Sequence, residues 1–123
     1  MLFGSYVKQK RLHNKMGLRR FCKATEIDAS TWSKVERNLT APTQNSGKLL
    51  KVADVLGLND AERTQMMDSA NVAAQRIPDD IQEDVELVNI LPALFRTIRD
   101  IRPSEDELRE YIKGLVESEN VEL

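Results

Sequence analysis

The chain has 123 residues, of which 41% are hydrophobic and 31% charged, and its formal net charge is −2. This composition is ordinary for a folded protein with a hydrophobic core and argues against a disordered chain. No apolar run approaches the roughly 18 residues of a membrane-spanning helix. The single cysteine, Cys22, has no internal disulfide partner, and the first residues lack the charge order of a secretory signal. We therefore expect a cytoplasmic protein.

The two halves of the chain differ strongly in charge. Residues 1–51 hold eleven Lys and Arg against three Asp and Glu, a net charge of +8, and residues 52–123 hold seven against seventeen, a net charge of −10. Such asymmetry suggests a nucleic-acid-binding face in the first half. The alternative is a pair of solvated surfaces of opposite charge that dock on each other or on a second subunit.

Helical patterns run through nearly the whole chain, because Val and Ile stand singly at helical spacings and no hairpin dipeptide occurs. The first five predicted helices span residues 2–14, 18–25, 29–37, 46–56 and 60–75. Asp28 is the predicted N-cap of the third helix, and Asn38 is predicted to end it in the left-handed conformation. Asn59 and Glu62 form a predicted capping box at the start of the fifth.

Residues 77–80, Ile-Pro-Asp-Asp, interrupt the helical pattern and mark a predicted boundary between residues 1–75 and residues 76–123. Beyond it we expect a short helix over residues 84–90 and a second helix that opens at Pro92 and reaches residue 100. A second capping box at residues 104–107 predicts a last helix to about residue 118. The fold class is therefore all-α, with an acidic helical extension at the C-terminus.

Residues 18–37 have the pattern of a helix-turn-helix, in which apolar side chains fill the crossing of two helices and short polar side chains face outward. The predicted buried set is Leu18, Phe21, Cys22, Ile27, Trp32 and Val35. Trp32 is interpreted as a core residue and not as a base-stacking ring. The predicted outer side of the second helix carries Ala29, Ser30, Thr31, Ser33 and Lys34.

This stretch resembles the helix-turn-helix of the Xre/Cro-type repressor family. Residues 33–38, Ser-Lys-Val-Glu-Arg-Asn, are similar to the family's Ser-Lys-Ile-Glu-Arg-Gly, and the match continues through Ala41-Pro42 and residues 48–58. The resemblance covers about residues 3–70 and implies a five-helix repressor-like DNA-binding domain that acts as a dimer. Two departures stand out, since Glu26 and Asn38 occupy positions where the family usually has glycine.

The resemblance also implies roles for individual residues. Ala29, Ser30 and Lys34 match the main base-reading positions, and Thr31 and Ser33 lie beside them. Arg11 and Glu36 match a partly buried structural ion pair. The candidate phosphate contacts are Arg19, Arg20, Lys23, Arg37, Thr40, Gln44, Asn45, Ser46 and Lys48, together with backbone N–H groups at the starts of the second and fourth helices.

The acidic extension is expected to bind protein and not DNA. Its apolar residues are Ile81, Val85, Leu87, Val88, Leu91, Leu94, Phe95, Ile98, Leu108, Tyr111, Ile112 and Leu115. The first domain, a second subunit or another protein must cover them, because small units expose most of their surface.

The leading functional prediction is a transcriptional repressor that binds operator DNA as a homodimer. The alternatives are an antitoxin that binds its toxin through the extension, and a regulator paired with an ImmA/IrrE-type metallopeptidase. The extension resembles a tail often found on small Xre-type regulators of mobile elements, and some of these are encoded beside a toxin or beside such a metallopeptidase. No nucleophile–base set and no Gly-rich phosphate loop is apparent, and His13 is the only histidine. We therefore expect no enzymatic activity, no metal and no cofactor.

Overall fold

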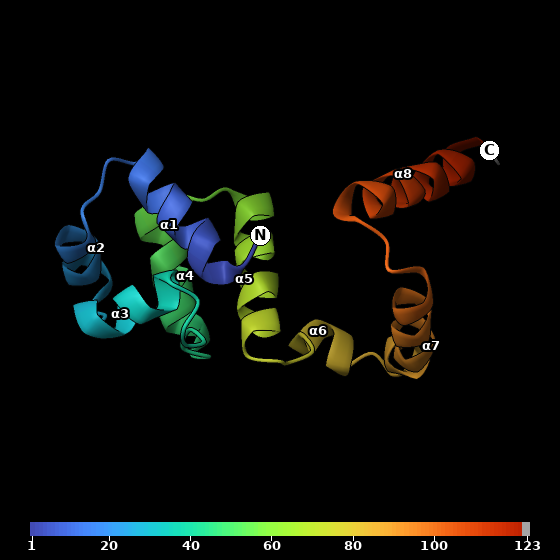
Figure 1. Ribbon diagram of the computed structural model, residues 1–123, viewed down its shortest axis with the longest axis horizontal. Helices are drawn as coiled ribbons and strands as arrows, with labels where there is room; N and C mark the ends of the chain where they lie inside the picture. Colours follow the sequence, from blue (N-terminus) through green and yellow to red (C-terminus); the bar gives the residue numbers. More distant parts are fainter. Residues whose placement is uncertain (122–123) are drawn as a thin grey trace. The chain divides into compact units, whose positions relative to one another are not determined.

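The computed structural model describes residues 1–121, apart from the side chains of residues 116 and 118–121, and all regular secondary structure in that part is helical (Figure 1). This agrees with the predicted all-α class. The helices are α1 (Phe3–His13), α2 (Leu18–Thr25), α3 (Ala29–Glu36), α4 (Ser46–Leu56), α5 (Asp60–Ala73), α6 (Asp79–Gln82), α7 (Val85–Ile101) and α8 (Glu105–Val121).

The ends of the first five helices follow the local signals in the sequence. α2 and α4 begin and end at the predicted residues, and α1, α3 and α5 are one or two residues shorter than predicted at one or both ends. Asn59 and Glu62 form the predicted capping box, in which Asn59 Oδ1 accepts from Glu62 N at 2.8 Å and Glu62 Oε1 accepts from Asn59 N at 3.0 Å. Asn38 has φ 59° and so takes the predicted left-handed conformation after α3.

The chain divides into two compact units, one of residues 1–79 and one that starts at residue 80. The division lies four residues beyond the predicted boundary after residue 75. Residues 76–79, the first four of the predicted extension, therefore belong with the first unit, where Arg76 forms an ion pair with Asp79 at 3.2 Å. The short α6 was not predicted, because Pro78 and the two acidic residues after it suggested only a break.

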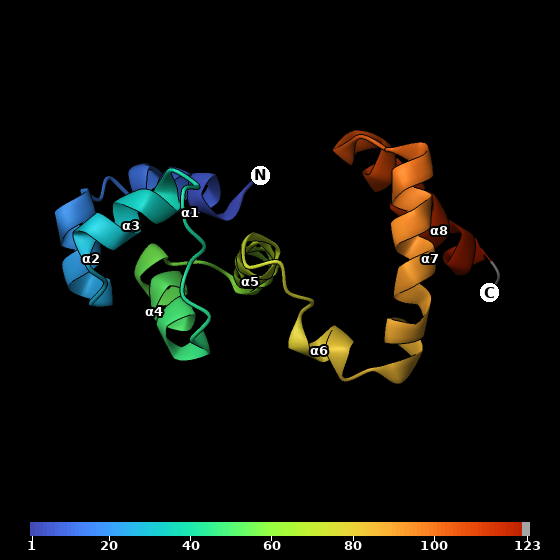
Figure 2. The same ribbon diagram turned by 60° about the horizontal axis from the view of Figure 1, so that its bottom comes forward.

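The first unit has a continuous hydrophobic core. Its helices pack in the pairs α1 with α3, α1 with α5, α2 with α3, α2 with α4, and α4 with α5 (Figures 1 and 2). The largest fully buried side chains are Trp32, Phe3, Phe21, Met66, Val7 and Val52. Cys22 is also buried, and this burial raises the pKa of its thiol, as expected for a core residue. Of the predicted buried set, Leu18 and Ile27 are half-buried against this core.

A close approach of backbones joins α1 to the end of α3. A Cβ atom at Gly4 would lie 2.1 Å from the carbonyl oxygen of Val35, so only glycine fits there. Asn38 completes the junction, because its Oδ1 accepts from Gly4 N at 3.0 Å and its Nδ2 donates to Ser5 Oγ at 3.1 Å. Asn38, which follows the end of α3, therefore also holds the start of α1 in place.

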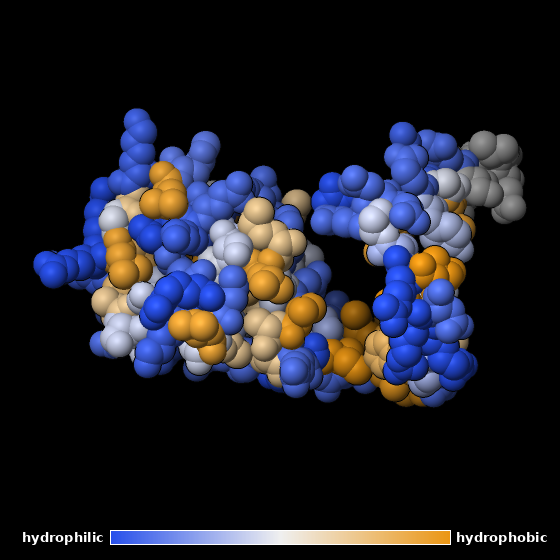
Figure 3. Space-filling view, in the orientation of Figure 1, coloured by the Kyte–Doolittle hydropathy of each residue, from blue (hydrophilic) through white to orange (hydrophobic). Residues whose placement is uncertain are grey.

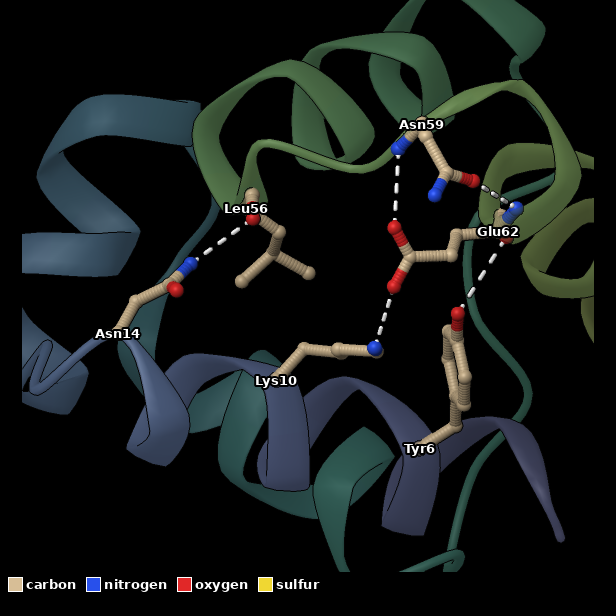
Figure 4. A network of polar contacts seen from close by, with 6 residues as sticks. All are labelled: Tyr6, Lys10, Asn14, Leu56, Asn59 and Glu62. Carbon is tan, nitrogen blue, oxygen red and sulfur yellow. Dashed lines mark hydrogen bonds and ion pairs between the residues drawn. The ribbon is translucent and has the colours of Figure 1, made fainter.

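Polar contacts tie α1, and Asn14 just after it, to the last residue of α4 and the first turn of α5 (Figure 4). Lys10 forms an ion pair with Glu62, and the Tyr6 hydroxyl donates to the Glu62 backbone oxygen at 3.4 Å. Asn14 Nδ2 donates to the Leu56 backbone oxygen at 2.8 Å. These bonds hold α1 against α4 and α5.

The prediction of two helices separated at Pro92 is wrong. The structure has one continuous helix over Val85–Ile101, with Pro92 inside it and Asp84 as its N-cap. The proline removes one intrahelical hydrogen bond, to the carbonyl of Val88, but its fixed φ suits a helix. The helix therefore continues through the proline.

The second unit lacks a core of its own among the described residues. None of its side chains is classed as buried, and α7 and α8 expose large apolar residues along their length. Figure 3 shows hydrophobic residues on the surface over α7. Ser104 Oγ accepts from Glu107 N at 3.1 Å and so caps α8, which is one of the two bonds of the predicted capping box. No helix in the described part of the chain is long and apolar enough to cross a bilayer.

Candidate nucleic-acid interface

The connection between α2 and α3 is a tight turn of three residues. Thr25 ends α2 with its hydroxyl bonded to the Phe21 backbone oxygen at 3.0 Å, and Ile27 N donates back to the Cys22 oxygen at 3.1 Å. Glu26 has φ 60° and ψ 32°, the left-handed conformation that glycine adopts most easily. Asp28 then caps α3 by accepting from Thr31 N at 3.0 Å.

Glu26 occupies a position where the resemblance implies glycine, and its backbone is nevertheless left-handed. The Glu26 side chain is exposed and forms an ion pair with Lys51 of α4 at 3.2 Å. Sequence reasoning missed this contact, since the two residues are 25 positions apart. A non-glycine residue in this conformation carries a backbone cost of about 1 to 2 kcal/mol, which the rest of the unit must offset.

Aromatic packing fixes the inner face of α3. Trp32 is 1% exposed, and its ring lies 5.0 Å from that of Phe21 and 6.1 Å, edge-on, from that of Phe3, as measured between centroids. The ring therefore belongs to the core, in agreement with the prediction, and it cannot stack on a base without unfolding the unit.

A buried ion pair fixes the C-terminal end of α3. Arg11 Nε and Nη2 each donate to a different oxygen of Glu36 at 2.8 Å, and the two side chains are only 8% and 5% exposed. Trp32 Nε1 also donates to Glu36, at 2.7 Å, and Arg11 Nη1 donates to the Met16 backbone oxygen at 2.8 Å. The hydrogen bonds to Glu36 raise the pKa of Arg11. The predicted pair thus exists, and it connects α1, α3 and the loop before α2.

The candidate base-reading residues divide into two groups by exposure. Ser30, Thr31 and Lys34 are exposed, whereas Ala29 and Ser33 are half-buried, and Ala29 packs against the core. Thr31 is further occupied, because its hydroxyl donates to the N-cap Asp28 at 3.2 Å. The side chains of Ser30 and Lys34 are therefore the ones that α3 offers to a ligand without giving up an internal contact.

The candidate phosphate contacts are all exposed. They are Arg19, Arg20 and Lys23 on α2, Arg37 and Thr40 after α3, and Gln44, Asn45, Ser46 and Lys48 around the start of α4. Some of these side chains already have partners: Arg37 Nε donates to the Ser33 oxygen at 3.3 Å, and Gln44 Nε2 donates to the Pro42 oxygen at 3.1 Å. The three cations of α2 have no ion pair in the described part of the chain.

The starts of α2 and α4 differ in how their backbone N–H groups are satisfied. Asn45 caps α4, since its Oδ1 accepts from Lys48 N at 3.0 Å. The N-cap of α2 is Gly17, which has no side chain to accept such a bond. The first turn of α2 therefore presents open N–H groups beside the cations Arg19 and Arg20, an arrangement that suits an anion.

The described residues contain no cluster of three or more His, Cys, Asp or Glu placed to hold a metal ion. An apolar pocket of about 330 Å³ lies between the start of α1, the loop after α3 and the end of α5, and it is lined mainly by hydrophobic residues.

The chain matches no family model, no curated protein and no solved structure.

Proposed function

We propose that this chain is a cytoplasmic, sequence-specific regulator of transcription that binds double-stranded DNA through a helix-turn-helix formed by α2 and α3. In this proposal α3 enters the major groove as the recognition helix of a five-helix, repressor-like domain. A homodimer occupies a symmetric operator and represses by blocking the promoter. No catalytic step belongs to the proposal, and neither does a metal or a cofactor.

The observation that carries the proposal is the division of α3 into a fixed face and an open face. Trp32 and Glu36 lock one face into the core, while Ser30 and Lys34 stand exposed on the helix. A rigid helix with short polar and cationic side chains facing outward suits base edges in a groove. The net charge of +8 in residues 1–51 supports the same reading, because DNA is a polyanion.

The roles of the side chains follow from their chemistry. The Lys34 ammonium is suited to the O6 and N7 acceptors of guanine, and the Ser30 hydroxyl donates to or accepts from either kind of edge. The half-buried Ala29 offers at most a methyl contact to thymine. Arg19, Arg20 and the open N–H groups of α2 are suited to phosphates, which set position and not sequence.

The test is selection of DNA sites from a random duplex library, followed by affinity measurements over a series of salt concentrations. Log affinity should fall with log salt by about 0.9 for each phosphate neutralised. Lys34→Ala should relax the base preference by about 1 to 3 kcal/mol at one position, whereas Arg19→Ala should weaken all sequences alike. Lys113→Ala, which removes an exposed cation from α8, is the matched control and should change neither quantity.

Absence of a selectable sequence, or an affinity independent of salt, would show that the proposed function is wrong. An unchanged site profile for Lys34→Ala would show instead that DNA meets a different face of α3.

A second candidate function rests on the second unit, which exposes many apolar side chains in an acidic sequence. Such a surface is suited to a protein partner. An antitoxin would use it to bind a basic toxin. A regulator paired with an ImmA/IrrE-type metallopeptidase would use it to bind the peptidase. Capture of a toxin or peptidase partner by the full chain, lost on removal of the second unit, would favour this candidate.

A further inference from the structure

The apolar face of α7 lies uncovered within the second unit. Along this face Leu87 is 40% exposed, Leu94 is 49% exposed and Ile98 is 47% exposed. A helix with so wide an apolar stripe normally buries it against another element. α8 covers this face only in part: no described side chain of the second unit is buried, and Leu94, Ile98 and Ile101 line an open apolar groove whose other wall is α8.

The spacing of the stripe is that of a coiled coil. Leu87, Leu91, Leu94, Ile98 and Ile101 follow one another at intervals of four, three, four and three residues. This is the a/d repeat with which one helix packs along another of the same kind, over a length of about 25 Å for a helix of 17 residues. Pro92 falls at an outer position of the repeat, where its ring does not disturb the seam.

The charges of α7 distinguish the two possible directions of such a pair. The N-terminal end carries Asp84 and Glu86, and the C-terminal end carries Arg96, Arg99 and Arg102 against one acid, Asp100. Parallel packing would place like charges side by side. Antiparallel packing places the acidic end of one helix beside the basic end of the other, and it also opposes the two helix dipoles favourably.

We propose that a second copy of this chain covers α7, and that the two α7 helices pack antiparallel about a two-fold axis with α8 at the flank. The spacing repeats on α8 as Leu108, Ile112 and Leu115, all exposed, and an apolar groove of about 360 Å³ lies between the two helices. Two copies supply four amphipathic helices, enough for a shared core. This inference rests on the homodimer of the proposed function but not on its binding of DNA.

The experiment measures the mass of the full chain by sedimentation equilibrium over a range of concentrations. The unchanged chain should be a dimer. The double variant Leu94→Asp/Ile98→Asp, with two charges in the seam, should be a monomer. The matched control Asn89→Asp/Ala93→Asp places the same two charges on the outer side of the same helix and should remain dimeric. Unchanged Trp32 fluorescence in each variant would show that the first unit is still folded.

Disulfide crosslinking tests the direction of packing. In an antiparallel pair centred on Leu94, Leu87 of one copy lies beside Ile101 of the other, and the two copies of Leu87 lie about 20 Å apart. A disulfide needs Cα atoms within about 7 Å of each other. Leu87→Cys alone should therefore give no crosslinked dimer on oxidation, whereas an equal mixture of Leu87→Cys and Ile101→Cys chains should give one. A Leu87→Cys chain that crosslinks to itself would show a parallel pair and overturn the antiparallel packing.

The outcomes separate this inference from the proposed function. A monomeric full chain, or a seam variant that stays dimeric, overturns the α7 interface whatever the DNA result. A chain that dimerises through α7 but selects no DNA sequence overturns the proposed function and leaves the interface standing. A monomeric chain that captures a toxin or peptidase through α7 assigns the face to that partner instead.

Discussion

Glu36 accepts three hydrogen bonds in the interior of the first unit, two from Arg11 and one from Trp32. A buried carboxylate is costly unless it is paired and bonded in this way. The arrangement fixes the rotation of α3 about its own axis, and that rotation decides which side chains face outward. At the scale of single residues, therefore, the candidate interface depends on a group that never touches the ligand.

Replacing Glu36 with alanine should lower the free energy of unfolding by about 3 to 5 kcal/mol, because Arg11 would remain buried without its carboxylate partner. Denaturant unfolding followed by Trp32 fluorescence measures the change. Arg109→Ala breaks an exposed ion pair with Glu105 and is the matched control, for which a change of about 0 to 1 kcal/mol is expected. A loss for Glu36→Ala no larger than that of the control would contradict the structural role.

Gly4 is the second residue whose identity the packing dictates. Gly4→Ala should destabilise the first unit by about 1 to 3 kcal/mol, because its Cβ would overlap the Val35 carbonyl and force α1 away from α3. Gly114→Ala provides a comparison, since open space surrounds that position in α8 and alanine favours a helix. The same denaturant measurement applies, and equal stability of the two variants would argue against the close approach.

At the scale of elements, the helices of the first unit are held by contacts between segments far apart in the chain. α1 meets α3 through Gly4 and Asn38, and it meets the first turn of α5 through the ion pair of Lys10 with Glu62 (Figure 4). α1 is therefore bonded to both α3 and α5, and it sets the position of α3 relative to α5.

The ion pair of α1 with α5 makes stability depend on pH. The hydrogen bond from Lys10, followed by that from the Asn59 backbone, lowers the pKa of Glu62 below its ordinary value of 4.5. A carboxyl group with a lowered pKa contributes stability above its unfolded pKa and loses that contribution as the pH falls through its folded pKa. The free energy of unfolding should therefore fall below about pH 4.5.

Glu62→Gln isolates the part that belongs to this residue. The variant should be less stable than the unchanged chain near pH 6, and the difference should shrink as the pH falls to 3, since the glutamine does not titrate. Urea unfolding at a series of pH values measures both curves. If the free energy of unfolding varied with pH in the same way for both chains, the Lys10–Glu62 ion pair would contribute no pH-dependent stability.

At the scale of the whole molecule, the two units differ in what stabilises them. Every buried hydrophobic residue of the described chain lies between Phe3 and Ala70, and the second unit adds none. The first unit should therefore fold without the second, whereas the apolar residues of α7 and α8 need cover from outside their own unit.

A chain that ends at Asp79 tests this difference. It should unfold cooperatively, with a free energy of unfolding of about 4 to 12 kcal/mol, the range usual for a domain of this length. Near-ultraviolet circular dichroism should show that the environment of Trp32 is unchanged, and sedimentation should show a monomer. A truncated chain without a cooperative transition would place part of the core in the second unit.

Local chemistry in the sequence determined most of the helix ends of this protein. Caps such as Asp28, Asn38 and Asn59 act on N–H and C=O groups a few residues away, so their effect is readable from neighbours in the chain. The spacing of apolar residues likewise indicated an all-helical fold, and the resemblance over about residues 3–70 implied the Arg11–Glu36 pair. The base-reading and phosphate-binding roles stay predictions, with the exposure of each residue now known.

The tertiary structure alone decided the features that depend on long-range contacts. The hydrogen bond between Gly4 and Asn38 joins residues 34 positions apart, and the Glu26–Lys51 ion pair joins residues 25 positions apart. No local sequence pattern predicts either contact. The path through Pro92 was also misjudged, because a proline's fixed φ suits either a helix start or a helix interior, and the sequence does not say whether the lost bond is tolerated. The reason for the two long-range contacts is that local hydrogen bonds follow from neighbouring residues, whereas contacts between distant segments depend on how the whole chain folds.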